Sequence, residues 1–178
     1  MSAISVFCGS RPGVRPGYAA LAADVGRLIA QRGVTLVYGG GRVGLMGALA
    51  DAALAANGRV IGVMPQMLID REVGHANLSE LHVVRTMAER KEMMGALSDA
   101  FLSLPGGTGT MDELFEAWTW TQLGLQRKPN GLLNYDGYYD PLIAFLDRSV
   151  SEGFLDARHR AGLWVDTDAA RLIARLCG

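Results

Sequence analysis

Apolar segments that end in glycine alternate with amphipathic segments along most of the chain, and this alternation is what most constrains its fold. Stretches such as YAALAADVGRLIAQRG and GLMGALADAALAANG place apolar residues at helical spacing, whereas MLIDREVGHANLSE has no sustained period and is expected to form a loop. The tail LWVDTDAARLIARLCG predicts a short extended piece and a closing helix. The predicted strands are AISVFCGS, VTLVYGGG, RVIGVMP, LHVVRTM, AFLSLPGG and NGLLNYDG.

Strands that are apolar on both faces are typical of a parallel sheet that is covered by helices. We therefore predict a doubly wound α/β fold, in which a Rossmann-like parallel sheet carries helices on both faces. No repeat or linker interrupts the pattern, so residues 1–178 are expected to form a single domain. In such a fold, ligands bind outside the carboxyl ends of the strands.

Charge and composition limit the classes of partner. The net charge is -1, and acidic and basic residues are spread along the chain, which predicts neither a nucleic-acid footprint nor a polybasic membrane patch. No apolar stretch approaches the length of a membrane span, and the first residues do not resemble a signal peptide. Cys8 and Cys177 lack the spacing of a disulfide framework, so we expect reduced thiols and a cytoplasmic location.

The turn from Gly39 to Gly44 matches GxGxxG between a predicted strand and helix. A nicotinamide dinucleotide site would need an acidic residue at the end of the next strand, which instead reads VIGVMPQ. The glycines Gly40, Gly41 and Gly44 therefore serve either a phosphate contact or close packing. Gly9 and Ser10, at the end of the first strand, form either a plain turn or a further ligand contact.

The segment LSLPGGTGTMDE is more specific. Pro105 ends the strand, the glycines permit a tight backbone with outward N–H groups, and a helix then presents its positive end. Asp112 and Glu113 are expected in the first turn of that helix, about 100° apart around its axis. One acid can therefore interact with the helix dipole in solvent, while the other turns into the crevice.

Arg90 and Lys91 in MAERKEMM are expected to open a helix, where positive charge opposes the local dipole. They form either a solvated face that Glu89 and Glu92 balance, or one side of a site with an anion or a carboxylate nearby. The second interpretation places them at the ligand edge of the sheet.

The three histidines are widely separated and have no metal-ligand spacing, so no metal is expected. Trp118 and Trp120 lie two residues apart on one predicted helix and therefore face different directions. We expect one of them in the core and the other at a dimer surface. The histidines are His75, His82 and His159.

PGGTGTMDE fits the PGGxGTxxE signature of the LONELY GUY family, and MAERK resembles the family's MHERK segment. Further similar blocks, in the same order, are SVFCGSRPG, LVYGGGRVGLMG, GVMP, DREV, EAWTWTQLGL and KPNGLLNYDGYYDPL, so the resemblance covers the chain up to about Gly153. It implies a Rossmann-like, commonly dimeric hydrolase that needs no cofactor. Such an enzyme cleaves cytokinin riboside 5'-monophosphates, which are N6-substituted AMP, to the free base and ribose 5-phosphate.

The resemblance also implies roles for individual residues. The catalytic pair falls on Arg90 and Glu113. The sequence departs from the family at Ala88, where His is usual, and at Thr108, where many members have Tyr, which bears on substrate preference. The implied substrate contacts are Glu72, Arg90, Lys91, Gly107, Thr108, Gly109, Thr110, Met111, Asp112, Glu113 and Thr119.

Cleavage of an N-glycosidic bond develops positive charge on the ribose, which a nearby carboxylate stabilises. We therefore expect Glu113 beneath the sugar, Arg90 in a bidentate pair with it, and the 5'-phosphate on the Gly-Thr turn. One alternative is a general nucleosidase for AMP or other purine monophosphates. Another is a non-catalytic nucleotide or cofactor carrier on the same scaffold.

Overall fold

The computed structural model describes residues 2–69 and 74–178. In this part of the chain, seven strands form one sheet, and every neighbouring pair is parallel. The strands are β1 (Ala3–Phe7), β2 (Thr35–Tyr38), β3 (Val60–Pro65), β4 (Glu80–Val84), β5 (Ala100–Ser103), β6 (Asn130–Leu133) and β7 (Leu163–Asp166).

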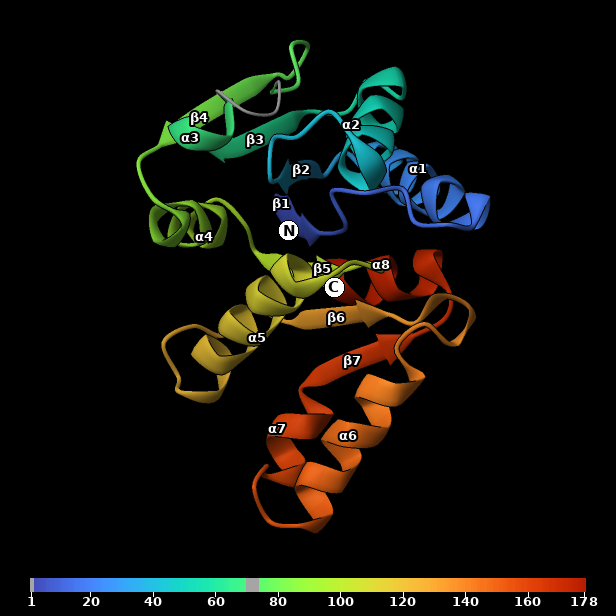
Figure 1. The fold of residues 1–178 in the computed structure, drawn as a ribbon, viewed down its shortest axis with the longest axis vertical. Helices are drawn as coiled ribbons and strands as arrows, with labels where there is room; N and C mark the ends of the chain where they lie inside the picture. Colours follow the sequence, from blue (N-terminus) through green and yellow to red (C-terminus); the bar gives the residue numbers. More distant parts are fainter. Residues whose placement is uncertain (1, 70–73) are drawn as a thin grey trace.

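The strand order is β4-β3-β2-β1-β5-β6-β7, so β1 lies in the middle of the sheet. The chain first runs outward from β1 to β4, then returns to the other side of β1 and continues outward to β7 (Figure 1). Ser5 of β1 is in register with Val37 of β2 and with Phe101 of β5. The order therefore reverses between β1 and β5, and a ligand crevice is expected at the carboxyl ends of these two strands.

Helices cover both faces of the sheet, as the doubly wound prediction requires. Helices α1, α2 and α8 lie on one side, and α4 and α5 lie on the other (Figure 1). The helices are α1 (Pro16–Gln31), α2 (Gly44–Ala55), α3 (Gln66–Ile69), α4 (Met87–Ala96), α5 (Thr108–Gln122), α6 (Asp140–Ser151), α7 (Ala157–Ala161) and α8 (Ala169–Cys177), with a 3-10 turn η1 (Tyr135–Gly137).

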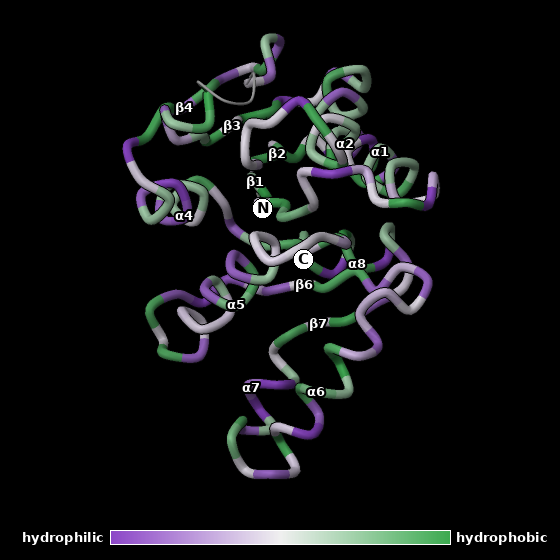
Figure 2. The backbone as a smooth tube through the Cα atoms, viewed as in Figure 1, coloured by the Kyte–Doolittle hydropathy of each residue, from purple (hydrophilic) through white to green (hydrophobic). Residues whose placement is uncertain are grey.

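The core forms because successive residues of a strand point to opposite faces of the sheet. Ile4 and Val6 of β1 pack under α1 and α2, whereas Phe7 packs on the other face. There Phe7 stacks on Phe101 of β5, with ring centroids 5.8 Å apart. The central strand β1 is accordingly buried along its whole length and mostly apolar (Figure 2).

Two short helices were not predicted. Helix α3 lies at the start of the stretch that was predicted as a loop, and α7 lies between the predicted last helices. Both are too short to show an apolar period, and α7 instead begins with an Asp156 cap whose side chain accepts a hydrogen bond from the Arg158 N–H. Across the described ranges, no helix combines the length and the apolar character needed to cross a membrane.

Candidate active site

The loop after β5 leads directly into α5, whose N-terminus is the first part of the site. Gly107 is the N-cap residue, and no side chain caps the helix. The Met111 N–H makes the first hydrogen bond of the helix, to the Gly107 carbonyl at 3.1 Å. The preceding amides therefore have no acceptor within the helix and can bind an anion.

The start of α5 corrects one expectation. The acids Asp112 and Glu113 were placed in the first helical turn, but the helix begins at Thr108, so they lie in its second turn. The physical reason is the packing of Thr110, which is buried in the first turn against Gly106. The Thr108–Thr110 stretch, expected as a loop, therefore forms the helix start itself.

Three glycines give this N-terminus its shape. A Cβ at Gly106 would lie 2.0 Å from the Thr110 Oγ1, so only glycine fits there. At Gly107 and Gly109, by contrast, a Cβ would meet no other atom within 4 Å. The backbone is thus packed tightly on one side and left open on the other, as close approach of a ligand requires.

A cavity of about 680 Å³ lies at the carboxyl ends of β1 and β5, where the strand order reverses. This volume is in the range of sites that hold small molecules. Its wall is formed by Val6, residues 8–13, Tyr18, Gly39, Leu45, Met46, Met64, Leu68, Arg90, residues 105–110, Glu113 and Tyr138.

Arg90 of α4 lines this cavity, and only 7% of the residue is exposed. Its Nε donates to the Val63 carbonyl at 3.0 Å, and its Nη2 donates to the Gly39 carbonyl at 2.8 Å. A Cβ at Gly39 would lie 1.9 Å from that Nη2. Glycine at position 39 therefore makes room for the guanidinium, and the ends of β2 and β3 fix its direction.

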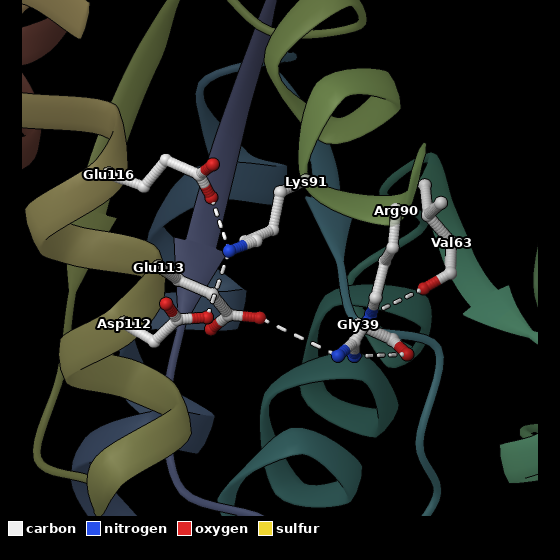
Figure 3. Close-up of polar contacts among 7 residues, drawn as sticks. All are labelled: Gly39, Val63, Arg90, Lys91, Asp112, Glu113 and Glu116. Carbon is white, nitrogen blue, oxygen red and sulfur yellow. Dashed lines mark hydrogen bonds and ion pairs between the residues drawn. The ribbon is translucent and has the colours of Figure 1, made fainter. Parts of the chain in front are cut away.

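The Glu113 side chain of α5 points toward Arg90 (Figure 3), and both residues line the cavity. Its Oε1 lies 3.6 Å from the Arg90 Nη1, and its side chain is 11% exposed. The predicted bidentate pair is wrong, because two of the guanidinium nitrogens are already bound to the Gly39 and Val63 carbonyls. The remaining contact between Arg90 and Glu113 is a single ion pair to the Oε1, which leaves the other Glu113 carboxylate oxygen available to another partner.

Burial raises the pKa of Glu113 from its ordinary value of 4.5 to about 7. The charges of Arg90 and Lys91 oppose this rise in the pKa, and the charge of Asp112 adds to it. A buried carboxyl group whose pKa lies near neutrality, beside a fixed cation and in a cavity, is typical of a functional site.

Asp112 turns the other way and is exposed. The Lys91 Nζ lies 3.0 Å from the Asp112 Oδ2 and 2.5 Å from the Glu116 Oε2, so it joins α4 to α5 (Figure 3). Lys91 does not line the cavity. The neighbouring acids therefore divide as expected, one toward solvent and the other toward the cavity. The cations Arg90 and Lys91 each have a carboxylate partner.

The other residues named from the sequence are distributed as follows. Gly9, Ser10, Gly107, Thr108, Gly109 and Thr110 line the cavity, whereas Met111, Thr119, Gly40, Gly41 and Gly44 do not. Glu72 lies outside the described residues.

Close packing accounts for the glycines Gly40 and Gly44 in the turn after β2. Gly40 and Gly44 have φ angles of +79° and +63°, which favour glycine. A Cβ at Gly44 would lie 2.4 Å from the Ser10 carbonyl carbon, so the turns after β1 and β2 contact each other here. Of the two interpretations of these glycines, the structure favours packing.

The histidines have separate surroundings. The Nε2 of His75 lies 2.8 Å from the Asp51 Oδ1, the Nε2 of His82 lies 2.7 Å from the Glu80 Oε1, and the His159 carbonyl accepts a hydrogen bond from the Trp118 indole. Residues 2–69 and 74–178 contain no group of three or more His, Cys, Asp or Glu side chains that could hold a metal ion.

Several residues of the cavity wall were not predicted. Met46 and Met64 contribute apolar surface, and Tyr138 contributes a hydroxyl that donates to the Gly106 carbonyl at 2.6 Å. Tyr138 follows β6, whose carboxyl end lies at the same edge of the sheet as that of β5. That position in the sequence is the signal that could have identified it.

The parallel, doubly wound sheet and the cavity at its switch point define a Rossmann-type α/β protein with a small-molecule site. Residues 46–176 match a family model described as "Possible lysine decarboxylase". The chain is 47% identical, over 174 residues, to a cytokinin riboside 5'-monophosphate phosphoribohydrolase of Rhodococcoides fascians, and the match covers 97% of this chain and 88% of that protein.

A probable cytokinin riboside 5'-monophosphate phosphoribohydrolase of Oryza sativa subsp. japonica is 50% identical over 154 residues, covering 86% of this chain and 69% of that protein. The solved structure of a molybdenum cofactor binding protein from Rippkaea orientalis matches with a TM-score of 0.75 and 25% identity, over 99% of this chain and 95% of that one. The chain belongs to the LONELY GUY family.

Proposed function

We propose that this protein hydrolyses the N-glycosidic bond of cytokinin riboside 5'-monophosphates, releasing the free base and ribose 5-phosphate. The observation that carries the proposal is the Arg90–Glu113 pair, which faces the cavity beside the free amides at the start of α5. An anion site and a buried carboxyl group within one cavity fit a substrate with a phosphate at one end and a reacting sugar carbon beside it. The names of the relatives support the same substrate class.

The phosphate binds the amides of residues 107–110, where the helix dipole also favours negative charge. The hydroxyls of Thr108 and Thr110 are further donors in the wall of the cavity. The ribose then extends from this helix end toward Glu113, one turn further along α5. The phosphate and the carboxylate share one helix end without occupying the same point.

Glu113 and Arg90 are the catalytic residues in this proposal. The Glu113 carboxylate stabilises the positive charge that develops at the anomeric carbon, and it orients or deprotonates the attacking water. Arg90 keeps that carboxyl group ionised more readily, since its charge lowers the Glu113 pKa. The water adds to the anomeric carbon as the bond to the base breaks, and the base takes up a proton.

Pyridoxal-phosphate chemistry does not fit this cavity. A lysine decarboxylase of that kind needs a lysine for the Schiff base. The chain contains two lysines, Lys91 and Lys128, and neither lines the cavity. Lys91 is paired with two carboxylates, and the Lys128 Nζ donates to the Gly95 carbonyl at 2.5 Å.

The function is tested by incubating the protein with isopentenyladenosine 5'-monophosphate, AMP and the two matching ribosides, with chromatography of the free bases. We expect base release from the prenylated monophosphate and none from its riboside. Equal or faster cleavage of AMP would instead indicate a general nucleosidase for purine monophosphates. Binding of the nucleotides without release of base would indicate a carrier.

The pH dependence of kcat/KM should report the titration of Glu113. Because the carboxylate is the active form, we expect kcat/KM to rise with pH around an apparent pKa of about 7. Asp112→Asn removes a charge that raises the Glu113 pKa, so the rising limb should move to lower pH. The substrate phosphate also titrates, with a second pKa of about 6, but it does so equally for both enzymes, so the difference between their profiles reports on the protein.

Asp147→Asn is the matched control, because Asp147 is exposed and does not act on the Glu113 pKa. Its pH profile should superimpose on that of the unsubstituted enzyme. A profile of Asp112→Asn that also superimposes would contradict the assignment of the rising limb to Glu113.

We also propose that the protein is a cytoplasmic homodimer acting as one domain. Leu123 and Leu125, at the end of α5, are 68% and 72% exposed, and Trp120 beside them is half-buried. These side chains would supply the apolar surface of such an interface. Light scattering should give twice the chain mass of 19.0 kDa, whereas a mass of one chain would contradict the dimer.

A further inference from the structure

Three successive carbonyl oxygens of the loop after β5 each accept a hydrogen bond from outside the loop. The donors come from the turn after β1 and from two adjacent tyrosines that follow β6. Each peptide between the end of the strand and the helix N-cap is therefore fixed in orientation. The bonds join the Tyr139 hydroxyl to the Leu104 carbonyl at 2.6 Å, the Gly9 N–H to the Pro105 carbonyl at 3.1 Å and the Tyr138 hydroxyl to the Gly106 carbonyl at 2.6 Å.

The last of these bonds also determines where an amide points. A peptide unit is planar, and in the trans form its C=O and N–H groups point in opposite directions. The described residues contain no cis peptide bond. The bond from Tyr138 to the Gly106 carbonyl therefore directs the Gly107 N–H away from Tyr138.

The Gly107 amide is free to bind a ligand. It donates to no acceptor among the described residues, and Gly107 lines the cavity. Both residues of this peptide are glycines, for which the backbone has an unusually wide choice of conformations. Without the bond from Tyr138, the Gly106–Gly107 peptide could rotate to other orientations, in which the Gly107 N–H no longer faces the ligand.

Tyr138 is itself well positioned for this task. Its ring makes edge contacts with Tyr18 and Tyr139, with centroids 5.7 and 4.8 Å apart. The neighbouring Tyr139 N–H donates to the Asn134 side chain at 2.8 Å, which ties the pair to the end of β6. Tyr138 nevertheless remains 40% exposed in the cavity wall, whereas Tyr139 is buried.

We propose that Tyr138 is a positioning residue for the phosphate group of the substrate: it orients the Gly106–Gly107 peptide, and it does not act on the sugar or the base. This inference rests on the proposed function, because it assigns a phosphate to the amides of α5. The hydroxyl of Tyr138 supplies the orienting bond, and its ring supplies only packing.

The test compares Tyr138→Phe with the unsubstituted enzyme, since Phe keeps the ring contacts and removes the bond. Calorimetry with ribose 5-phosphate should show binding weakened about fivefold to tenfold, as expected for the loss of one orienting hydrogen bond. Binding of free isopentenyladenine should not change. The KM for isopentenyladenosine 5'-monophosphate should rise by a similar factor, with a smaller change in kcat.

Tyr135→Phe is the matched control, because Tyr135 packs on Tyr18 in the same cluster and its hydroxyl bonds to no described residue. It should bind ribose 5-phosphate like the unsubstituted enzyme. Unchanged affinity in Tyr138→Phe, or an equal loss of affinity for the base, would overturn the positioning role alone. If the unsubstituted enzyme bound no ribose 5-phosphate and released no base, the proposed function itself would fail.

Discussion

Glu113→Gln is expected to lower kcat for isopentenyladenosine 5'-monophosphate by about 10²- to 10³-fold, the scale found for loss of one electrostatic stabiliser. Gln has nearly the same shape and can still accept a hydrogen bond from Arg90, but it carries no negative charge to stabilise the ribose or activate water. KM should change much less, because the phosphate contacts remain. Steady-state kinetics at pH 8, where Glu113 is mostly ionised, measures the effect.

The same substitution should stabilise the fold at neutral and higher pH. The Glu113 pKa is raised from 4.5 to about 7, so the folded state holds its proton more tightly than the unfolded state. The resulting loss of stability is absent below pH 4.5 and complete above pH 7, where it amounts to about 3 kcal/mol. In urea unfolding, the free energy of unfolding of Glu113→Gln should increase relative to that of the unsubstituted enzyme as the pH rises from 5 to 8.

The two measurements on Glu113→Gln check each other. A large loss of kcat in a protein that is equally or more stable assigns the loss to chemistry and not to unfolding. Near-native kcat in Glu113→Gln would show that the carboxylate is not the catalytic group. A stability difference that does not change with pH would show that Glu113 titrates normally.

Arg90→Ala is expected to reduce kcat at pH 7 by about 10²-fold or more and also to destabilise the fold. The truncation removes the charge that lowers the Glu113 pKa, so less carboxylate is present at neutral pH. It also leaves the Gly39 and Val63 carbonyls without their donors, at a cost of about 1–3 kcal/mol for each unsatisfied group. Kinetics between pH 6 and 9, together with urea unfolding, separates the two effects.

Arg90→Lys is the informative control. Lysine keeps the positive charge, but it cannot reproduce the fork that binds the Gly39 and Val63 carbonyls together. It should therefore restore part of the kcat, and its apparent pKa should lie below that of Arg90→Ala. If Arg90→Ala retained near-native kcat and the same pH profile, Arg90 would be only a packing residue.

The fold could be predicted from the sequence because the strands are short and apolar on both faces, and the turns after them contain glycine. That pattern gave the parallel sheet and placed the loops after β1 and β5 at one edge, without any knowledge of side-chain contacts. Helix α7 was missed because five residues cannot show a helical period. The start of α5 was misplaced because the packing of Thr110 against Gly106 is a tertiary contact.

The site was predictable only as a set of candidates. A positive charge near the start of a helix opposes the helix dipole, and this position of Arg90 indicated a nearby carboxylate. The Glu113 Oε1 lies 3.6 Å from the Arg90 Nη1. The sequence could not show that the guanidinium is held by the ends of two other strands, because that depends on how β2, β3 and α4 come together. The place of Tyr138 after β6 does put it at the ligand edge of the sheet, but its hydrogen bond to the Gly106 carbonyl is a tertiary contact that the sequence could not show.

The central claim is an orientation: the phosphate on the α5 amides and the anomeric carbon over residue 113. A crystal structure of Glu113→Gln with isopentenyladenosine 5'-monophosphate tests it most directly. We expect phosphate oxygens within hydrogen-bond distance of the amides of residues 107–110 and the ribose facing the side chain at 113. A nucleotide bound in the reverse direction, with its base against those amides, would contradict the account.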